Sequence, residues 1–478
     1  MYLLKKKIKD LQVNKNESIT KAIEKINLSK IKIIFVIDDA NKLIGSITDG
    51  DIRRSILDGV DLISRVDTIV SKNYIYAKVL DSLDVLYKMT SHKIRVIPIV
   101  DEDHKVVDYF EYTQSMHFPI ATPSLNGNEF KYLSDAFFST WISSQGEYLN
   151  KFEEGFSQYS DCKYGVAVSN GTVALHLALI ALGIGQGDEV IIPDLTFAAT
   201  INAVLHANAT PIIVDIEEDS WCIDPIEIEE SITNKTKAII PVHIYGQVCD
   251  MKKIMTIAKR YNLKVIEDCA EAHGAMFNDK KVGSFGDIGC FSFYGNKIIT
   301  TGEGGMCTTN NTELDRKMRV LRDHGMSKDK RYWHDVVGYN YRMTNLQAAI
   351  GLAQVERIEI IHENRRKYEN SYKDILNSNA FIFQKDIENR QRITWLVSIL
   401  IYEKTDREDY LSKLQERGID ARPFFYPLSD MDIYKQYCKK DTLVTSAISK
   451  SGINLPAYES LNNMKKIQYI LNKHFNNA

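Results

Sequence analysis

From Val166 onward, short apolar runs alternate with longer helical runs, and this alternation limits the chain to few folds. The apolar runs are rich in β-branched residues and lie at 166–168, 189–192, 211–214, 238–242 and 264–266. Helical patterns lie between several of them, as at 173–182 and 251–261. Such alternation predicts an α/β domain with a mainly parallel sheet covered by helices. Sheets of this kind bind ligands at the carboxyl ends of their strands.

The last part of the chain, from about residue 356, has the pattern of a smaller α+β domain. Residues 395–401 are a strand candidate, and residues 410–417 are a helix candidate that ends at Gly418. A chain of 478 residues is too long for one ordinary core. We therefore expect a large domain over residues 118–355 and a small C-terminal domain over residues 356–478, with a polar linker at 113–128 leading into them.

Residues 1–117 contain an internal repeat. Residues 35–44 align with residues 98–107: an apolar strand, an acidic turn, a lysine and a second apolar strand. A helical pattern precedes each of them, at 18–26 and 82–90. Two small units that together complete one core are the simplest arrangement for such a repeat. The repeat resembles a CBS-domain pair.

The first unit carries a strand-to-helix sequence, GSITDGDIRR at 45–54, that is similar to the ribose-contacting pattern of CBS domains. The resemblance places Thr48 and Asp51 as nucleotide contacts, where a carboxylate accepts hydroxyl hydrogen bonds and a helix N-terminus favours an anion. The alternative is that an acidic residue only caps the helix. The second unit departs from the pattern, with Glu111 and Gln114 at the matching positions.

Composition excludes several classes of function. The net charge of −3 gives no overall basic field for nucleic acid or an acidic membrane. The seven cysteines include no C-x-x-C pair, so we expect reduced thiols and no metal site. The first residues lack the apolar stretch of a signal peptide, and no apolar run has the length of a membrane span. These features predict a soluble, cytoplasmic protein.

One lysine stands in an unusual setting. Lys297 follows the aromatic run FSFYGN at 291–296 and precedes the glycine-rich run at 302–305. Glycines in tight turns let the backbone approach a ligand closely. A lysine removed from water can act as a nucleophile and form a Schiff base.

Two further motifs follow apolar runs. The sequence VIEDCAEAHG at 265–274 places Asp268 at the carboxyl end of a strand, where its carboxylate can keep a pyridine nitrogen protonated. The sequence SNGTVALH at 169–176 places Gly171 and Thr172 at the start of a helix, where backbone amides suit a phosphate. Taken singly, a helix cap or a surface turn explains each motif equally well.

Together, in this order and spacing, the three motifs resemble the DegT/DnrJ/EryC1/StrS family of sugar aminotransferases over residues 118–478. The resemblance implies the aspartate-aminotransferase type of fold (fold type I) and the cofactor pyridoxal 5′-phosphate. It implies that Lys297 binds the cofactor and moves the proton, and that Asp268 contacts the pyridine nitrogen. It also implies the remaining cofactor contacts, which are Gly171, Thr172 and Ser292 at the phosphate, Phe197 stacked on the ring and Glu271 beside the ring hydroxyl. Asn340 matches an asparagine that reaches the phosphate across the interface between two subunits, which implies a homodimer or a higher homo-oligomer.

The sugar is indicated by further stretches, at 140–144, 242–247, 331–334 and 339–357, that resemble the family members that form GDP-perosamine. This resemblance implies amino transfer from L-glutamate to the 4-keto carbon of GDP-4-keto-6-deoxymannose, for surface polysaccharide biosynthesis. Tyr332, Trp333 and Arg422 are the candidate contacts to the substrate. Ser429 stands where the family commonly has a histidine near the sugar, which leaves a UDP-linked 4-keto sugar of the bacillosamine or legionaminic acid type open.

Two other functions compete with transamination. A dehydratase of the same family has a histidine at the lysine position, so Lys297 argues against it. A nucleotide-sensing regulator on an inactive aminotransferase scaffold is suggested by the CBS pair. The retention of Lys297, Asp268 and Thr172 argues against an inactive scaffold.

Overall fold

The computed structural model divides into two compact units, Met1–Met116 and His117–Ala478. It describes residues 8–29, 31–71, 74–81, 85–86, 89, 94, 96–111, 118–376, 380–401, 406–459, 461, 464, 467–468 and 470–471. Most of the second helical pattern of the repeat, at 82–90, lies outside these residues. In the described part of the chain, no helix is long and apolar enough to span a membrane.

The first unit contains two small sheets with the same topology. In each sheet a first strand pairs in parallel with a second, which pairs antiparallel with a third. The register shifts between Val36 and Ile37 in one sheet and between Ile99 and Val100 in the other, which confirms the repeat. The elements are η1 Ile8–Leu11, β1 Gln12–Asn14, α1 Ile19–Leu28, β2 Ile33–Ile37, β3 Leu43–Thr48, α2 Asp49–Leu57, η2 Val66–Thr68, β4 Ala77–Lys78, β5 Val96–Val100 and β6 Val106–Glu111.

The second unit is built around a seven-stranded sheet with strand order β7-β15-β14-β11-β10-β8-β9. Every neighbouring pair is parallel except the two pairs that β15 makes with β14 and β7, so the predicted mainly parallel sheet is confirmed. The strands are β7 Tyr164–Val168, β8 Glu189–Pro193, β9 Thr210–Val214, β10 Thr236–Ile239, β11 Lys264–Asp268, β14 Ile288–Ser292 and β15 Gly305–Thr309. β10 ends at Ile239, before the Val242 that we expected, because Pro241 has no N–H to donate.

Both faces of this sheet are covered by helices, because alternate strand residues point into two different cores. Val190 and Ile192 pack with α6, α7 and α10, whereas Ile191 packs on the other face with α5, α8, α9 and α11. The helices are α4 Glu129–Phe138, α5 Glu147–Tyr159, α6 Gly171–Ala181, α7 Ala199–His206, α8 Pro225–Glu230, α9 Met251–Tyr261, α10 Thr312–Arg322 and α11 Asn345–Val355, with η3 at Ile244–Gly246.

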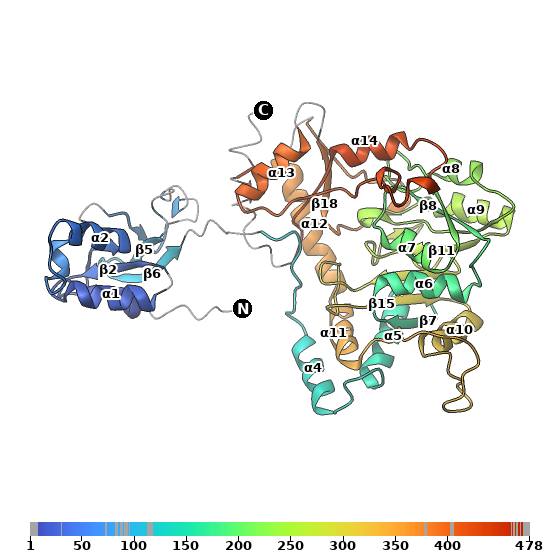
Figure 1. The fold of residues 1–478 in the computed structure, drawn as a ribbon, viewed down its shortest axis with the longest axis horizontal. Helices are drawn as coiled ribbons and strands as arrows, with labels where there is room; N and C mark the ends of the chain where they lie inside the picture. Colours follow the sequence, from blue (N-terminus) through green and yellow to red (C-terminus); the bar gives the residue numbers. More distant parts are fainter. Residues whose placement is uncertain are drawn as a thin grey trace. The chain divides into compact units, whose positions relative to one another are not determined.

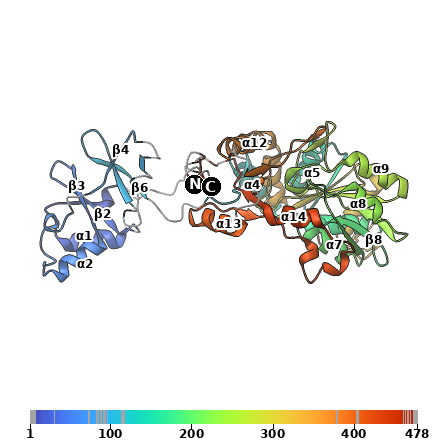
Figure 2. The same ribbon diagram turned by 90° about the horizontal axis from the view of Figure 1, so that it is seen from above.

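The C-terminal part forms a four-stranded sheet, β16-β18-β20-β19, joined to the larger sheet by the long helix α12 (Figure 1). Both views place α12 and α13 toward one end of the unit and α8 and α9 toward the other (Figure 2). A further sheet has the order β13-β12-β17, in which β12 pairs antiparallel with both β13 and β17. The bounds are α12 Ile358–Ile375, β16 Phe381–Phe383, β17 Arg390–Gln391, β18 Val397–Ile401, α13 Arg407–Glu416, β19 Arg422–Pro423, η4 Leu428–Asp430, η5 Lys435–Tyr437, α14 Leu443–Ser451 and β20 Gly452–Leu455, with β12 at Met276–Phe277 and β13 at Lys280–Lys281.

Candidate active site

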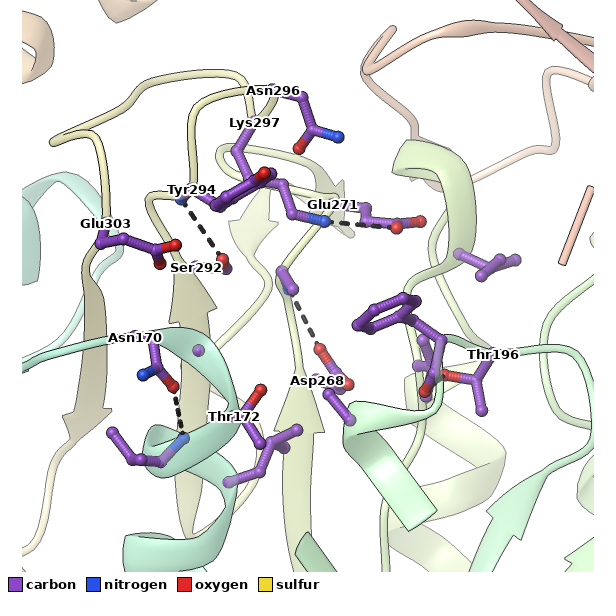
Figure 3. A pocket seen from close by; sticks show the side chains of 18 of the residues that line it. Asn170, Thr172, Thr196, Asp268, Glu271, Ser292, Tyr294, Asn296, Lys297 and Glu303 are labelled. Atoms are coloured by element: carbon purple, nitrogen blue, oxygen red, sulfur yellow. Dashed lines mark hydrogen bonds and ion pairs between the residues drawn. The ribbon is translucent and has the colours of Figure 1, made fainter. Parts of the chain in front are cut away.

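A cavity of about 700 Å³ lies at the carboxyl ends of β7, β8, β11 and β14 (Figure 3). This is the edge where the sequence predicted a ligand, because parallel strands open there into loops and helix N-termini. Residues near positions 170, 196, 268 and 292, at or just after the ends of these strands, line the cavity.

Lys297 reaches into the cavity from the loop after β14. Its Nζ lies 3.4 Å from Glu271 Oε1 and 4.4 Å from the centroid of the Trp395 ring. Trp395 Nε1 donates a hydrogen bond of 2.8 Å to the Asn296 carbonyl, and the Arg365 guanidinium donates one of 3.3 Å to the Lys297 carbonyl. The lysine therefore stands on a loop whose backbone is fixed from the C-terminal part of the chain.

Asp268 is the last residue of β11 and lies at the inner wall of the cavity. Thr200 Oγ1 donates a hydrogen bond of 2.8 Å to Asp268 Oδ2, and the backbone N–H of Ala270 donates one of 3.2 Å to Oδ1. Burial raises the pKa of Asp268, and the hydrogen bonds together with the charge of Lys297 oppose this rise. The result is a buried carboxylate that faces a cationic partner.

Glu271 lies beside the lysine and is almost wholly buried. The backbone N–H of Tyr245 donates a hydrogen bond of 2.9 Å to its Oε2, while Oε1 faces Lys297. Burial raises the pKa of Glu271, and the nearby ammonium of Lys297 opposes the rise. The carboxylate is thus held from one side by the backbone and meets the lysine from the other.

The opposite end of the cavity is the N-terminus of α6. The Asn170 side chain caps the helix by accepting from the backbone N–H of Val173 at 3.0 Å. A Cβ at Gly171 would lie 2.7 Å from the Cβ of Ser292, so only glycine fits between the helix and β14. Thr172 also lines the cavity there. A helix start with free backbone N–H groups is a good site for a phosphate.

These features allow a test of whether pyridoxal phosphate fits the cavity. The cofactor presents a carbonyl, a basic ring nitrogen, a ring hydroxyl and a phosphate. The cavity offers an amine at Lys297, a buried carboxylate at Asp268, a polar group at Glu271 and the helix N-terminus at Gly171. Each group of the cofactor has a chemically suited partner, so the residues fit it.

Seven of the eight predicted cofactor contacts line this one cavity, and they are Gly171, Thr172, Phe197, Asp268, Glu271, Ser292 and Lys297. The eighth, Asn340, is exposed and lies outside the lining. Arg342 Nε donates to Asn340 Oδ1 at 3.0 Å, and Arg342 Nη1 donates to Asp323 at 3.1 Å. Because the Arg342 guanidinium hydrogen-bonds to the amide oxygen of Asn340, the amide nitrogen of Asn340 points away from Arg342.

The predicted sugar contacts do not line the cavity of the single chain. Tyr332 and Trp333 are exposed on the loop after α10, and Arg422 forms an ion pair of 2.6 Å with Asp420. Ser429, which replaces the family histidine, also lies outside the lining, and its hydroxyl donates to the buried Asp194 at 2.7 Å.

Sequence reasoning missed several residues at the site. Thr200 lies one helical turn after Phe197, and this spacing is a signal that could have indicated it. Tyr245 lies within the run 242–247, but the resemblance of this run did not predict a role for Tyr245 itself. Trp395 is about 100 positions from Lys297, and nothing in the sequence pairs the two.

Three buried side chains, His243, Glu267 and Cys269, bring possible metal ligands within 4.8 Å of one another. Three backbone N–H groups at 283–286 donate to the Glu267 carboxylate at 2.8–2.9 Å. His243 Nδ1 accepts from the N–H of Cys249 at 3.2 Å, which leaves the proton on Nε2, 3.2 Å from Glu267. These hydrogen bonds use the lone pairs that a metal needs, so we assign no metal here.

In the first unit, Thr48 and Asp51 form a capping box at the start of α2. Thr48 Oγ1 and the Thr48 backbone N–H lie 2.7 and 2.8 Å from Asp51 Oδ2, and Arg54 lies 2.6 Å from Oδ1. Both carboxylate oxygens therefore have partners within the unit, as expected of a helix cap.

Known proteins resemble the two units separately. The model of the CBS domain matches residues 8–58, which is the first half of the repeat. GDP-perosamine synthase of Escherichia coli O157:H7 is 46% identical over 351 residues, which cover 73% of this chain and 96% of that protein. GDP-perosamine synthase of Caulobacter vibrioides is 45% identical, and the matched residues cover 72% of this chain and 93% of that protein.

A solved structure gives the same fold. The aminotransferase PseC of Helicobacter pylori, involved in the biosynthesis of pseudoaminic acid, has a TM-score of 0.71 at 27% identity, over 76% of this chain and 100% of its own. The model of the DegT/DnrJ/EryC1/StrS aminotransferase family matches residues 123–474. With that match and the lysine, carboxylate and helix N-terminus assembled in one cavity, the chain belongs to the DegT/DnrJ/EryC1/StrS family of pyridoxal-phosphate-dependent aminotransferases.

Proposed function

We propose that the protein transfers an amino group from L-glutamate to the 4-keto carbon of GDP-4-keto-6-deoxymannose and so forms GDP-perosamine. The observation that carries the proposal is the placement of the Lys297 amine in the cavity between Glu271 and Trp395, with Asp268 at the inner wall. The similarity to two GDP-perosamine synthases over more than 90% of their lengths supports the choice of sugar.

The cavity assigns distinct tasks to its residues. When bound, pyridoxal phosphate supplies an electron-withdrawing ring that stabilises negative charge on the substrate carbon beside the nitrogen. Asp268 would accept a hydrogen bond from the ring nitrogen and keep it protonated, so the ring would withdraw electrons more strongly. Thr200 and the Ala270 amide hold this carboxylate in place. The helix N-terminus at Gly171 would hold the phosphate.

Lys297 Nζ moves the proton to and from the substrate carbon. Glu271 lies 3.4 Å from this nitrogen and limits where the flexible lysine side chain points. The Trp395 ring covers the same nitrogen at 4.4 Å and helps to exclude water from it. The division of residues 118–478 into a cofactor domain over 118–355 and a small domain over 356–478 is part of this proposal.

The working form is a homodimer, and two features support this. The exposed Asn340 amide is oriented by Arg342 and lies outside the cavity of its own chain. A set of large apolar side chains on α4 and the following loop is exposed, which marks a surface for association: Phe130, Phe137, Phe138, Trp141 and Ile142. A second copy of the chain would cover this set and bring Asn340 to the neighbouring phosphate.

A nucleotide at Thr48 and Asp51 is a separate part of the proposal. Its ribose hydroxyls would take the place of Thr48 and Arg54 at the Asp51 carboxylate. Calorimetric titration of ATP and GTP into the full chain and into Asp51→Asn tests this. Binding that the substitution abolishes supports the site, and equal heats in both proteins leave Asp51 as a helix cap only.

Turnover decides the main proposal. Purified protein with pyridoxal phosphate and glutamate is offered GDP-4-keto-6-deoxymannose or a UDP-linked 4-keto-6-deoxy sugar, and the amino sugar is detected by its mass. We expect product from the GDP sugar. Product from the UDP sugar alone would keep the aminotransferase and reject perosamine. Lys297→Ala should abolish turnover, whereas the exposed Lys435→Ala serves as the matched control.

A further inference from the structure

The turn that precedes α9 contains a strained tyrosine. Tyr245 is wholly buried and adopts φ 52° and ψ 26°, the left-handed region that favours glycine. The next residue, Gly246, has φ 89°, and a Cβ there would lie 2.2 Å from the Ile393 carbonyl. A bulky residue stays in this conformation only where its surroundings fix it, and such positions cluster at functional sites.

Tyr245 joins the cavity to the C-terminal part of the chain through its two polar ends. Its backbone N–H donates a hydrogen bond of 2.9 Å to Glu271 Oε2, the carboxylate whose other oxygen faces Lys297. Its hydroxyl accepts a hydrogen bond of 2.8 Å from the backbone N–H of Phe425.

The ring of Tyr245 lies among aromatic side chains from the same C-terminal part. It stacks on Trp395, with centroids 6.2 Å apart and planes at 12°, and packs on Phe424 with centroids 4.5 Å apart. The ring of Trp395 is the one that covers Lys297 Nζ. Both neighbours of this nitrogen, Glu271 and Trp395, therefore contact Tyr245 directly.

The backbone around Tyr245 is held from the same direction. Gln384 Nε2 donates to the Ile244 carbonyl at 3.3 Å, and the N–H of Ile393 donates to the Gly246 carbonyl at 3.0 Å. The Gln247 side chain donates to the Lys385 carbonyl at 2.8 Å. A shift of residues 384–393 would therefore move the turn and, with it, the N–H that holds Glu271.

We infer that Tyr245 is a positioning residue. Its backbone N–H fixes the Glu271 carboxylate beside Lys297, and its contacts with the C-terminal part of the chain determine where this N–H lies. The inference rests on the proposed cofactor cavity and adds to it the residue that joins the two parts. A tyrosine that only filled space would contribute to the fold in the same way whether or not Glu271 were present.

A double-mutant cycle separates these two roles. The proteins are the wild type, Tyr245→Phe, Glu271→Ala and the double variant, and Tyr372→Phe is the matched control. Tyr372 is also wholly buried, and its hydroxyl has no hydrogen-bond partner among the described residues. The measured quantities are the dissociation constant of pyridoxal phosphate, from its visible absorbance on titration, and the melting temperature of each cofactor-free protein.

We expect Tyr245→Phe to weaken pyridoxal phosphate binding about 3–10-fold, the range for one lost buried hydrogen bond, and to change the shape of the visible band. Added to Glu271→Ala, the same substitution should cause no further weakening. Tyr372→Phe should leave the dissociation constant unchanged. If Tyr245→Phe does not fold, Gln384→Ala removes a hydrogen bond that holds the same turn at the Ile244 carbonyl and replaces it in the cycle.

An equal weakening by Tyr245→Phe in both backgrounds would overturn the inference, because the effect would not pass through Glu271. The inference would also be overturned if Glu271→Ala weakened pyridoxal phosphate binding and Tyr245→Phe did not. A wild-type protein that binds no pyridoxal phosphate would instead reject the cofactor cavity itself, so the two failures are distinguishable.

Discussion

The Thr200 hydroxyl, in the first turn of α7, donates a hydrogen bond of 2.8 Å to the Asp268 carboxylate. The bond fixes the direction in which a buried acid presents its second oxygen, which is the property a ring nitrogen needs from its partner. We expect Asp268→Asn to reduce turnover by at least about 100-fold, since a buried charge-assisted hydrogen bond contributes about 3 kcal/mol. Steady-state kinetics with saturating pyridoxal phosphate measures this loss.

Thr200→Val is the graded control for that substitution, because it leaves the carboxylate and removes one of its donors. The expected loss is about tenfold, in line with about 1.5 kcal/mol for one hydrogen bond to a charged group. A Thr200→Val protein as impaired as Asp268→Asn would mean that the threonine contacts the substrate or cofactor itself.

Active sites should be shared between the two subunits of the dimer. We expect Lys297→Ala and Asn340→Ala each to be inactive when pure, and a mixture of the two, unfolded and refolded together, to regain activity. Random pairing makes half of the dimers mixed with one intact site each, so about a quarter of wild-type activity should return. Activity at the level of the separate variants after mixing would place Asn340 in the site of its own chain.

The stability of the fold should depend on pH through Glu369. Burial alone would raise its pKa, but hydrogen bonds from Arg392 and Thr394 and the charge of Lys373 lower it to about 2, against an ordinary value of 4.5. The ionised form therefore stabilises the fold above pH 4.5 by about 3 kcal/mol, and this contribution is lost as the pH falls toward 2.

Melting curves of wild type and Glu369→Gln at several pH values test this dependence. The substitution should lower the melting temperature clearly at pH 7. At pH 3 the effect should be much smaller, because the ionised native carboxylate then contributes less to the free energy of unfolding. The exposed Glu416→Gln should give the same small difference at both pH values. A gap between wild type and Glu369→Gln that does not narrow in acid would contradict the assigned pKa.

The helix cap at Thr48 should matter to the first unit alone. Thr48→Ala removes the side chain that caps α2 and should destabilise that unit by about 1 kcal/mol. Calorimetric melting of the full chain should show the shift in the transition of the first unit. Loss of aminotransferase turnover in Thr48→Ala would show instead that the unit influences the active site.

Much of this fold follows from local sequence rules. Short apolar runs rich in β-branched residues, with helical runs between them, predicted β7, β8, β9 and β11 to within two residues, and 251–261 is the full extent of α9. The helix expected at 410–417 begins earlier, at Arg407, because Asp406 caps it by accepting from the N–H of Glu408.

The residues that sequence did not predict depend on tertiary contacts. Trp395 and Tyr245 meet Lys297 and Glu271 only because the C-terminal sheet packs against the cavity. The left-handed backbone of Tyr245 runs against the preference of its residue type, so no local rule indicates it. Ser429 was compared with a histidine near the sugar, yet its hydroxyl bonds to Asp194, a partner more than 200 positions away.

The close approach of Gly171 to Ser292 also limits which amino-acid substitutions the protein can accumulate in evolution. A methyl group added at position 171 would overlap the Cβ at position 292, so the helix cannot carry a side chain there while the strand carries one opposite it. A complete library of single substitutions should find position 171 intolerant even of alanine. Lineages that place a side chain at position 171 must therefore also change position 292, or shift the helix relative to the strand.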